Sequence, residues 1–113
     1  MKDESVKNKF GKVQIKESVI ASIAGLSATD VKGVRSLAGG IEHDMITHED
    51  GKSLARAIRV SIQDGKISLK IAIVLDGTRA VPEVARALQE KVKSYLEMMT
   101  GNEVTSIDVI VAG

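Results

Sequence analysis

The tightest constraint on the fold is an alternating stretch from Ile58 to Ile73 that is interrupted once, by Asp64-Gly65. On both sides of this dipeptide every second residue is large and apolar, which is the pattern of half-buried strands. Asp-Gly suits a two-residue hairpin turn because both turn positions need a positive φ. The turn also sets the register, which pairs Ile62 with Ile67, Val60 with Leu69, and Ile58 with Ile71. These residues share one face, so the pattern and the turn predict the same hairpin.

A second long pattern, from Val81 to Gly101, predicts a helix. Its apolar residues recur at steps of three and four, which keeps one helix face apolar. The members of this face are Val81, Val84, Ala85, Leu88, Val92, Tyr95, Leu96 and Met99. The opposite face carries charges of alternating sign, and Pro82 and Gly101 suit the two helix ends. We therefore expect a surface helix that packs on a sheet.

Ahead of these elements, residues 1–9 are polar and are predicted to form a flexible tail, followed by a strand over Phe10–Ile15. A helix is expected from about Lys16 to Val31. Gly25 within it costs about 1 kcal/mol relative to alanine, which indicates a close approach to another element. The residues that this helix is expected to turn inward are Val19, Ile20, Ile23, Ala24, Ser27, Ala28 and Val31.

The remaining segments complete one α+β domain over residues 10–113. Val34–Leu37 is predicted as a short strand or an extended link, and Ala38–Ser53 as the longest loop, with a helical turn near Ile41–Ile46. The chain closes with a strand whose expected inward residues are Thr105, Ile107, Val109 and Val111. The order β-α-(β)-β-β-α-β predicts a two-layer sandwich, with two helices on one face of a mainly antiparallel sheet.

Composition argues against several classes of function. The 16 basic and 15 acidic side chains nearly cancel, which argues against a dedicated nucleic-acid binder but leaves a local basic patch open. With no cysteine, the chain has no disulfide or thiolate metal site and fits a reducing cytoplasm. The longest apolar run, Ile71–Leu75, is far shorter than the roughly 20 residues of a transmembrane helix.

No residue pattern supports catalysis or a cofactor. No serine lies in a nucleophile elbow, and both histidines fall in the predicted loop. That loop does hold four candidate ligands for zinc or manganese: His43, Asp44, His48 and Asp50. Their spacing matches no rigid metal motif, and polar loops collect such residues by composition alone. We therefore predict no metal site, and the four residues stay candidates only.

The outward face of the predicted hairpin is basic. Arg59 lies opposite Lys70, and Lys66 lies nearby, opposite Gln63. Like charges directly across a strand pair are mildly destabilising, so an anionic neighbour is expected. Three interpretations are open: Asp108 of the last strand lies alongside, the long side chains extend into water, or the face binds an acidic partner or a phosphate backbone.

Beside the basic residues, Ala57, Ala72, Val74 and Ile110 share the parity of the same outward face. If helices cover only the other face of the sheet, these residues form an exposed apolar strip. Such a strip usually marks a subunit or partner interface. We prefer self-association as its explanation, and the alternative is an edge buried under the Ala38–Ser53 loop.

Several short motifs resemble one known family. They are GKVQI at 11–15, VIASIAG at 19–25, VKGV at 31–34, Gly39-Gly40, VPEVA at 81–85, QEKV at 89–92, MTG at 99–101 and the segment 104–109. In this order they resemble the alkaline shock protein family, also called the envelope stress response family of Gram-positive-type bacteria. The resemblance covers Phe10 to Ala112, and the loop around His43–Asp50 departs from it.

The resemblance implies a small cytoplasmic protein without catalytic residues or cofactors. Some members self-associate, and some are held at the membrane by a separate membrane-spanning partner, so we expect a homo-oligomer and a membrane-anchored protein partner. The leading interpretation is a structural or scaffold protein in cell-envelope stress, and the alternative is a nucleic-acid-associated module that uses the basic sheet face. The expected contact residues are Arg59, Lys66, Lys70, Ala72, Val74 and Ile110.

Overall fold

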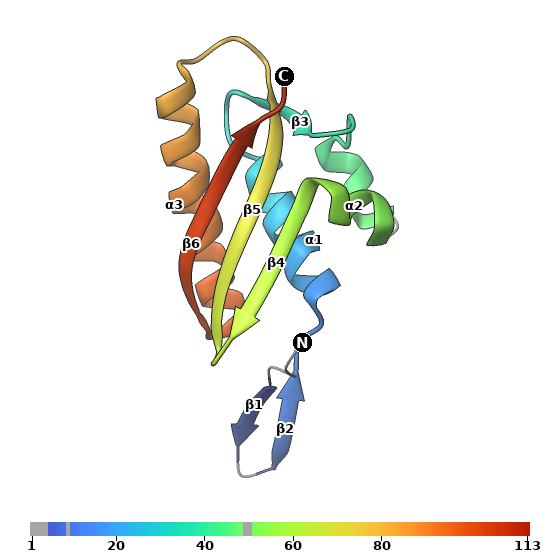
Figure 1. Ribbon diagram of the computed structural model, residues 1–113, viewed down its shortest axis with the longest axis vertical. Coiled ribbons are helices and arrows are strands. Elements are labelled where there is room, and N and C mark those ends of the chain that lie inside the picture. The colour runs from blue at the N-terminus through green and yellow to red at the C-terminus, as the bar shows by residue number, and fades with distance from the viewer. Residues whose placement is uncertain (1–4, 9, 49–50) are drawn as a thin grey trace.

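The structure is a computed structural model that describes residues 5–8, 10–48 and 51–113. Its elements are β1 (Ser5–Asn8), β2 (Gly11–Gln14), α1 (Glu17–Thr29), β3 (Val34–Leu37), the 3-10 helix η1 (His43–His48), α2 (Gly51–Ala57), β4 (Ile58–Gln63), β5 (Lys66–Leu75), α3 (Val81–Thr100) and β6 (Glu103–Val111). Strands β3 to β6 form one sheet, and α1 and α3 lie behind it on one face (Figure 1). The predicted α+β class is confirmed.

The hairpin of β4 and β5 forms in the predicted register. Its pairs include Ile62 with Ile67, Val60 with Leu69, and Ile58 with Ile71. The turn residues Asp64 and Gly65 have φ values of 52° and 75°, the left-handed conformations that a two-residue turn requires. Local sequence therefore determines this part of the sheet.

Strand β5 is the centre of the sheet. Its first part pairs antiparallel with β4 and its last residues pair antiparallel with β3, both along one edge. Strand β6 pairs in parallel along the other edge. A parallel neighbour needs a crossover connection, and α3 supplies it between β5 and β6. The order of the strands in the sheet thus follows from their pairing to β5.

Helix α3 turns a straight row of residues toward the sheet. The row consists of Val84, Leu88, Val92, Leu96 and Thr100, all buried and four residues apart. The helix ends as predicted, because Gly101 takes a left-handed φ of 73° and its N–H donates to the carbonyl of Glu97. The predicted inward face is wider than the buried one, since Val81, Tyr95 and Met99 are 47%, 41% and 54% exposed.

Helix α1 approaches the rest of the molecule through a glycine, as predicted. A Cβ atom added to Gly25 would lie 3.2 Å from Cδ1 of Ile58 and 3.3 Å from Cδ1 of Ile46. The prediction is wrong for Val19, which is 47% exposed, and Ile23 is only half-buried. The predicted inward residues that are buried are Ile20, Ala24, Ser27, Ala28 and Val31.

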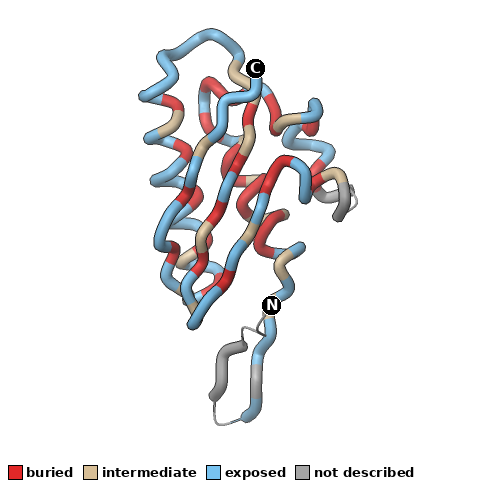
Figure 2. The backbone as a smooth tube through the Cα atoms, viewed as in Figure 1, coloured by how far each residue is buried: buried red, intermediate tan, exposed pale blue. Residues whose placement is uncertain are grey.

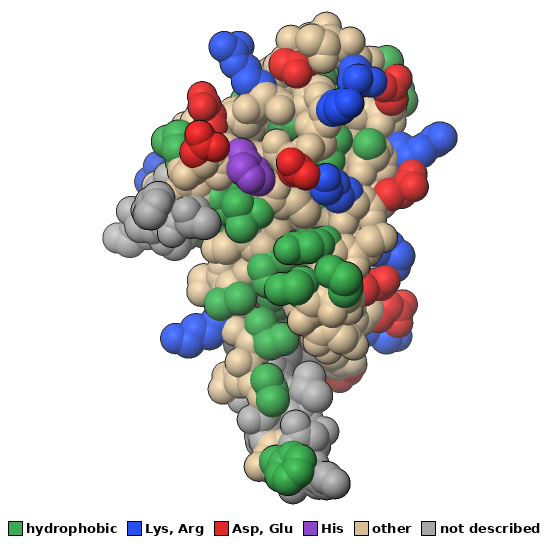
Figure 3. Space-filling model, turned by 180° about the vertical axis from the view of Figure 1, so that it is seen from behind, with side chains coloured by type: hydrophobic (Ala, Val, Ile, Leu, Met, Phe, Trp, Pro, Cys, Tyr) green, Lys and Arg blue, Asp and Glu red, His purple; other side chains and the backbone are tan. Residues whose placement is uncertain are grey.

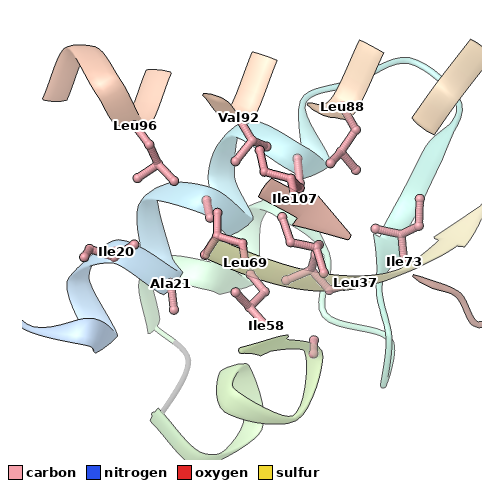
Figure 4. Packing of buried hydrophobic residues seen from close by; sticks show 14 of the residues in the cluster. Ile20, Ala21, Leu37, Ile58, Leu69, Ile73, Leu88, Val92, Leu96 and Ile107 are labelled. Carbon is pink, nitrogen blue, oxygen red and sulfur yellow. The ribbon is translucent and has the colours of Figure 1, made fainter. Parts of the chain in front are cut away.

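The core lies between the sheet and the two helices. In Figure 2 the buried residues alternate along the strands and recur on the inner sides of α1 and α3. In Figure 4, Leu88, Val92 and Leu96 of α3 point toward Leu69 and Ile107 of the sheet. Burial of each such aliphatic side chain contributes about 1.5–3 kcal/mol, so this layer supplies much of the driving force for folding.

The amino-terminal strand differs from the prediction in its partner. Strand β2 lies within the predicted strand Phe10–Ile15, but it pairs with β1 instead of joining the main sheet. Strand β1 falls inside the predicted tail, of which residues 1–4 and 9 lie outside the described residues. Alternation in the predicted strand places Val13 and Ile15 on one face, but Val13 is 49% exposed whereas Ile15 packs against the core. Both edges of β5 are already occupied, which leaves β2 no place beside it.

The segment predicted as the longest loop contains helical structure. Its helix η1 corresponds to the turn expected near Ile41–Ile46, but α2, which begins at Gly51, corrects the prediction of a loop. Ile46 and Leu54 anchor the segment, with exposures of 1% and 3%. Such sparse anchors produce no periodic signal in the sequence. Residues 49–50 lie outside the described ones.

Strand β6 starts at Glu103, two residues before the first predicted inward residue, Thr105, and its register against β5 shifts at Thr105. Thr105 is an extra residue that has no paired residue on β5. Because of it, Val104 points into the core and Thr105 is exposed, which is the reverse of the orientation predicted for Thr105. Ile107 and Val109 keep their predicted inward positions. Val111, at the end of the strand, is 43% exposed.

A charged cluster connects the end of α3 to the start of β6. The carboxylate of Glu97 accepts hydrogen bonds from Nζ of Lys93 at 2.8 Å and from the backbone N–H of Val104 at 2.9 Å. Nζ of Lys93 also donates to the Val104 carbonyl at 3.0 Å. The bond from Lys93, followed by that from Val104, holds the pKa of Glu97 below its usual range.

Acid should weaken this connection. Since the pKa of Glu97 is lower in the folded state, its ionised carboxylate stabilises the fold above the unfolded-state pKa. That contribution is lost as the pH falls through the folded-state pKa. We expect the free energy of unfolding to fall more for the wild type than for Glu97→Gln between about pH 6 and about pH 3. Urea denaturation measures both, and equal losses in the two proteins would contradict the assignment.

Gly33 is the glycine whose replacement should cost most. Its φ is 100°, and an added Cβ would lie 2.6 Å from Cγ2 of Val84 in the core. Gly40 has a similar φ of 78°, but its Cβ would meet nothing within 4 Å. We expect Gly33→Ala to lower the free energy of unfolding by about 2–4 kcal/mol and Gly40→Ala by about 1 kcal/mol. Chemical denaturation measures both, and similar losses would show that Val84 moves aside.

Candidate protein-interaction surface

In the part of the chain that the structure describes, one face of the sheet is left uncovered, and it carries the contact residues that the sequence analysis selected. Because α1 and α3 lie on the other face, alternate residues of β4, β5 and β6 point to the open side (Figure 1). Arg59, Lys66 and Lys70 are all exposed there, as expected from the parity of the hairpin. The structure therefore brings the three basic residues onto one surface.

Acidic residues of β6 lie beside these basic ones. Arg59 pairs with Lys70 across the hairpin, and Lys70 pairs with Asp108 on its other side. Lys66 pairs in the same way with Glu103. The expected anionic neighbour of Lys70 is thus Asp108. Among the described residues, no ion pair within 4.0 Å joins these side chains, so the surface is a row of exposed, mixed charges.

A small apolar area adjoins the charged row. Ala72 pairs with Ile110, and Val74 continues the outward row of β5. Ile110 is 47% exposed, whereas Ala72 and Val74 are half-buried. Ala57, which parity also placed here, is instead buried at the end of α2. We call Ala72, Val74 and Ile110 the outer apolar patch.

The candidate metal ligands do not form a described cluster. Nδ1 of His43 lies 2.8 Å from Oγ1 of Thr29, and Asp44 is exposed. Asp50 and the side chain of His48 lie outside the described residues. In the part of the chain that the structure describes, no group of three or more histidine or carboxylate side chains could hold a metal ion.

A groove on the helix side was missed by the sequence analysis. It lies between α1 and β4 and has a volume of about 920 Å³. After Glu17 at its first position, α1 carries no charged residue up to its end at Thr29, so the rest of the helix is apolar or neutral on all sides. A helix that is apolar all round is usually covered by other elements on every side, so this pattern was the sequence signal that could have indicated the groove. The groove lining includes Val19, Ser22, Ile23, Leu26, Leu54 and Val60.

Hydrophobic side chains gather on the helix side of the molecule. Figure 3 shows them as a band that runs from the middle of this side toward the amino-terminal hairpin. Both helices expose large apolar residues, among them Val19 at 47%, Met98 at 70% and Met99 at 54%. Within the described ranges, no helix is long and apolar enough to cross a membrane.

Comparison with known proteins identifies related sequences. A model of the alkaline shock protein family, described as having a cell envelope-related function, matches residues 5–113. The chain is 27% identical over 104 residues to the uncharacterized protein YqhY of Bacillus subtilis, covering 92% of the chain and 77% of YqhY. It is 26% identical over 110 residues to the uncharacterized protein YloU of the same organism, covering 96% of the chain and 92% of YloU.

Solved structures of another protein have a similar fold. A structure named MamM-CTD 215-293 matches with a TM-score of 0.54 and 15% identity, over 87% of this chain and 99% of that one. A manganese form of a MamM CTD variant matches with a TM-score of 0.53, 15% identity and the same coverage. At this level of identity the likeness concerns the fold alone.

The mixed-charge row can be tested through Asp108. Without its charge, Lys70 loses the anion directly opposite it on β6 while it still faces Arg59 on β4, and like charges directly opposite destabilise a strand pair. We expect Asp108→Asn to lower the free energy of unfolding by about 0.2–1 kcal/mol, and Lys70→Gln to remove most of that loss in the double variant. Urea denaturation of the wild type, the two single variants and the double variant measures the coupling between Asp108 and Lys70. A coupling of zero, or one that high salt leaves unchanged, would contradict this account.

Proposed function

The chain belongs to the alkaline shock protein family, whose function is related to the cell envelope, and from this premise we propose that it is a non-catalytic structural or scaffold protein. It acts in the cell-envelope stress response by associating with further copies of itself and with a membrane-anchored partner protein. The family description supports the link to the envelope. The open face of the sheet supports a role through protein contacts.

The outer apolar patch is the observation that carries this proposal. Protein interfaces commonly have an apolar centre and a polar rim, and the patch is bordered by the exposed charged row described above. Ile110 lies on β6, which pairs with β5 alone among the described strands, so nothing described extends the sheet beyond it. A second copy or a partner that covers this face would bury Ile110 together with the half-buried Ala72 and Val74.

The charges on the same face favour a protein partner over a nucleic acid. Lys66 and Lys70 each have an acidic residue directly opposite, Glu103 and Asp108. A phosphate backbone gains affinity from positive charge, and it would be repelled by these two carboxylates. A protein surface with charges of both signs can pair with both kinds of side chain. Mixed charge therefore supports the scaffold role.

Ile110→Asp tests the contact surface. Val81→Asp is a matched control, because Val81 is also 47% exposed but lies at the start of α3, where an acidic residue is tolerated. We expect Ile110→Asp to weaken self-association about tenfold or more, since it places an unpaired charge in the interface, and Val81→Asp to leave it unchanged. Sedimentation measures self-association, and thermal unfolding confirms that both variants fold.

Crosslinking in cells tests the choice of partner. The tagged protein should retain further copies of itself and a membrane-spanning protein, and Ile110→Asp should lose both. Retention mainly of RNA or DNA that high salt removes would contradict the scaffold role, because steep salt dependence is the property of phosphate contacts. Full retention of both proteins by Ile110→Asp would contradict the assignment of the surface.

A further inference from the structure

The groove between α1 and β4 lies along an open edge of the sheet. Strand β4 pairs with β5 on one side, and no described strand pairs with its other side. Such an edge offers backbone hydrogen-bonding groups to an extended segment that lies along it. Beside this edge, Val19, Ile23 and Leu26 of α1 supply an apolar wall. The edge and the groove together fit an extended segment that carries apolar side chains.

One end of the groove holds a carboxylate oxygen without a partner. Glu17, in the first turn of α1, lines the groove, and its Oε2 atom is buried without a hydrogen-bond donor. Among the described residues, this is the one buried side-chain nitrogen or oxygen in that condition. A buried acceptor that stays unpaired destabilises the structure, and more so when it is charged. A positively charged side chain from another molecule would remove this destabilisation.

The amino-terminal hairpin has the properties that the groove requires. It projects from one end of the body in Figure 1, and Phe10, in its turn, is 88% exposed. Val13 of β2 is 49% exposed. A two-stranded hairpin by itself is only marginally stable in water, so a docking surface would stabilise it. By sequence, residues 5–14 contain three lysines and no acidic residue, which complements the carboxylate of Glu17.

We propose that the β1–β2 hairpin of one copy docks into the α1–β4 groove of a second copy. The hairpin lies along the free edge of β4, the exposed side chains of Phe10 and Val13 enter the groove, and the positive charge of the segment complements Glu17. This inference deepens the self-association in the proposed function and rests on it. It concerns a different area, because the groove follows the free edge of β4 and the outer apolar patch lies on β5 and β6. Arg59 of the charged row also lines the groove, but among the described residues no ion pair joins it to Glu17.

The connection between the hairpin and α1 favours a second copy over the same chain. Only Ile15 and Lys16 separate β2 from α1. Ile15 packs against the core, and Lys16 is extended, with φ −71° and ψ 146°. The hairpin therefore leads away from the body along its long direction (Figure 1). To reach its own groove it would have to reverse within two residues, whereas a second copy can receive it as it stands.

Disulfide trapping tests the contact directly, because the chain has no native cysteine. Full chains with Phe10→Cys are mixed with differently tagged full chains with Ser22→Cys, a groove position, and oxidised mildly. Ser94→Cys on α3 is the matched control, since Ser94 is an exposed helical serine outside the groove lining. Docking raises the local thiol concentration, so we expect about tenfold more mixed dimer with Ser22→Cys than with Ser94→Cys. Equal yields would overturn the inference.

Sedimentation of Phe10→Asp and Ile110→Asp separates this inference from the proposed function. Weaker self-association in Phe10→Asp, together with the Ser22→Cys mixed dimer, supports the hairpin contact even if Ile110→Asp has no effect. A loss in Ile110→Asp alone, with no excess of the Ser22→Cys mixed dimer, overturns the hairpin contact and leaves the sheet-face contact standing. A wild-type chain that stays monomeric, or a different protein captured by Ser22→Cys in place of a second copy, also overturns it.

Discussion

The rest of the structure depends on the burial of β5 at the centre of the sheet. Its inward side chains, Ile67, Leu69, Ile71 and Ile73, are at most 3% exposed. Every other strand of the main sheet is placed by its hydrogen bonds to β5, since β4 and β3 share one edge and β6 occupies the other. Helix α3 connects β5 to β6 and packs over the same apolar row. Loss of this row would remove the surface on which both helices rest.

The same arrangement explains where surface remains for partners. Two helices cover one face of the sheet, so the opposite face and the outer edges of β4 and β6 stay open within the described residues. The apolar surface that this leaves includes two separate areas: the outer apolar patch and the groove beside β4. Contacts through both areas would let each copy bind more than one neighbour. That property suits the scaffold role that we propose.

Sequence reasoning succeeded where the structure follows from neighbouring residues and failed where it depends on distant ones. The register of the β4–β5 hairpin and the end of α3 at Gly101 were predicted because turn and cap conformations are local. The positions of Val19, Tyr95 and Met99 were wrong, because an apolar residue beside a helix's buried row looks the same in sequence as one within it. The groove was missed for this reason, and the partner of β2 because strand pairing is not local.

The sequence by itself determined the α+β class, the hairpin with its basic outward face, and the extent of the long helix. These features depend on alternation, helical periodicity and the left-handed conformations of Asp64, Gly65 and Gly101. Only the tertiary structure decided that β6 pairs along the edge of β5 opposite to β3 and β4, and that Asp108 therefore lies beside Lys70. It also decided that the amino-terminal hairpin stays outside the main sheet. The reason is that distant segments compete for two edges of one strand, and the outcome depends on the packing of the whole chain.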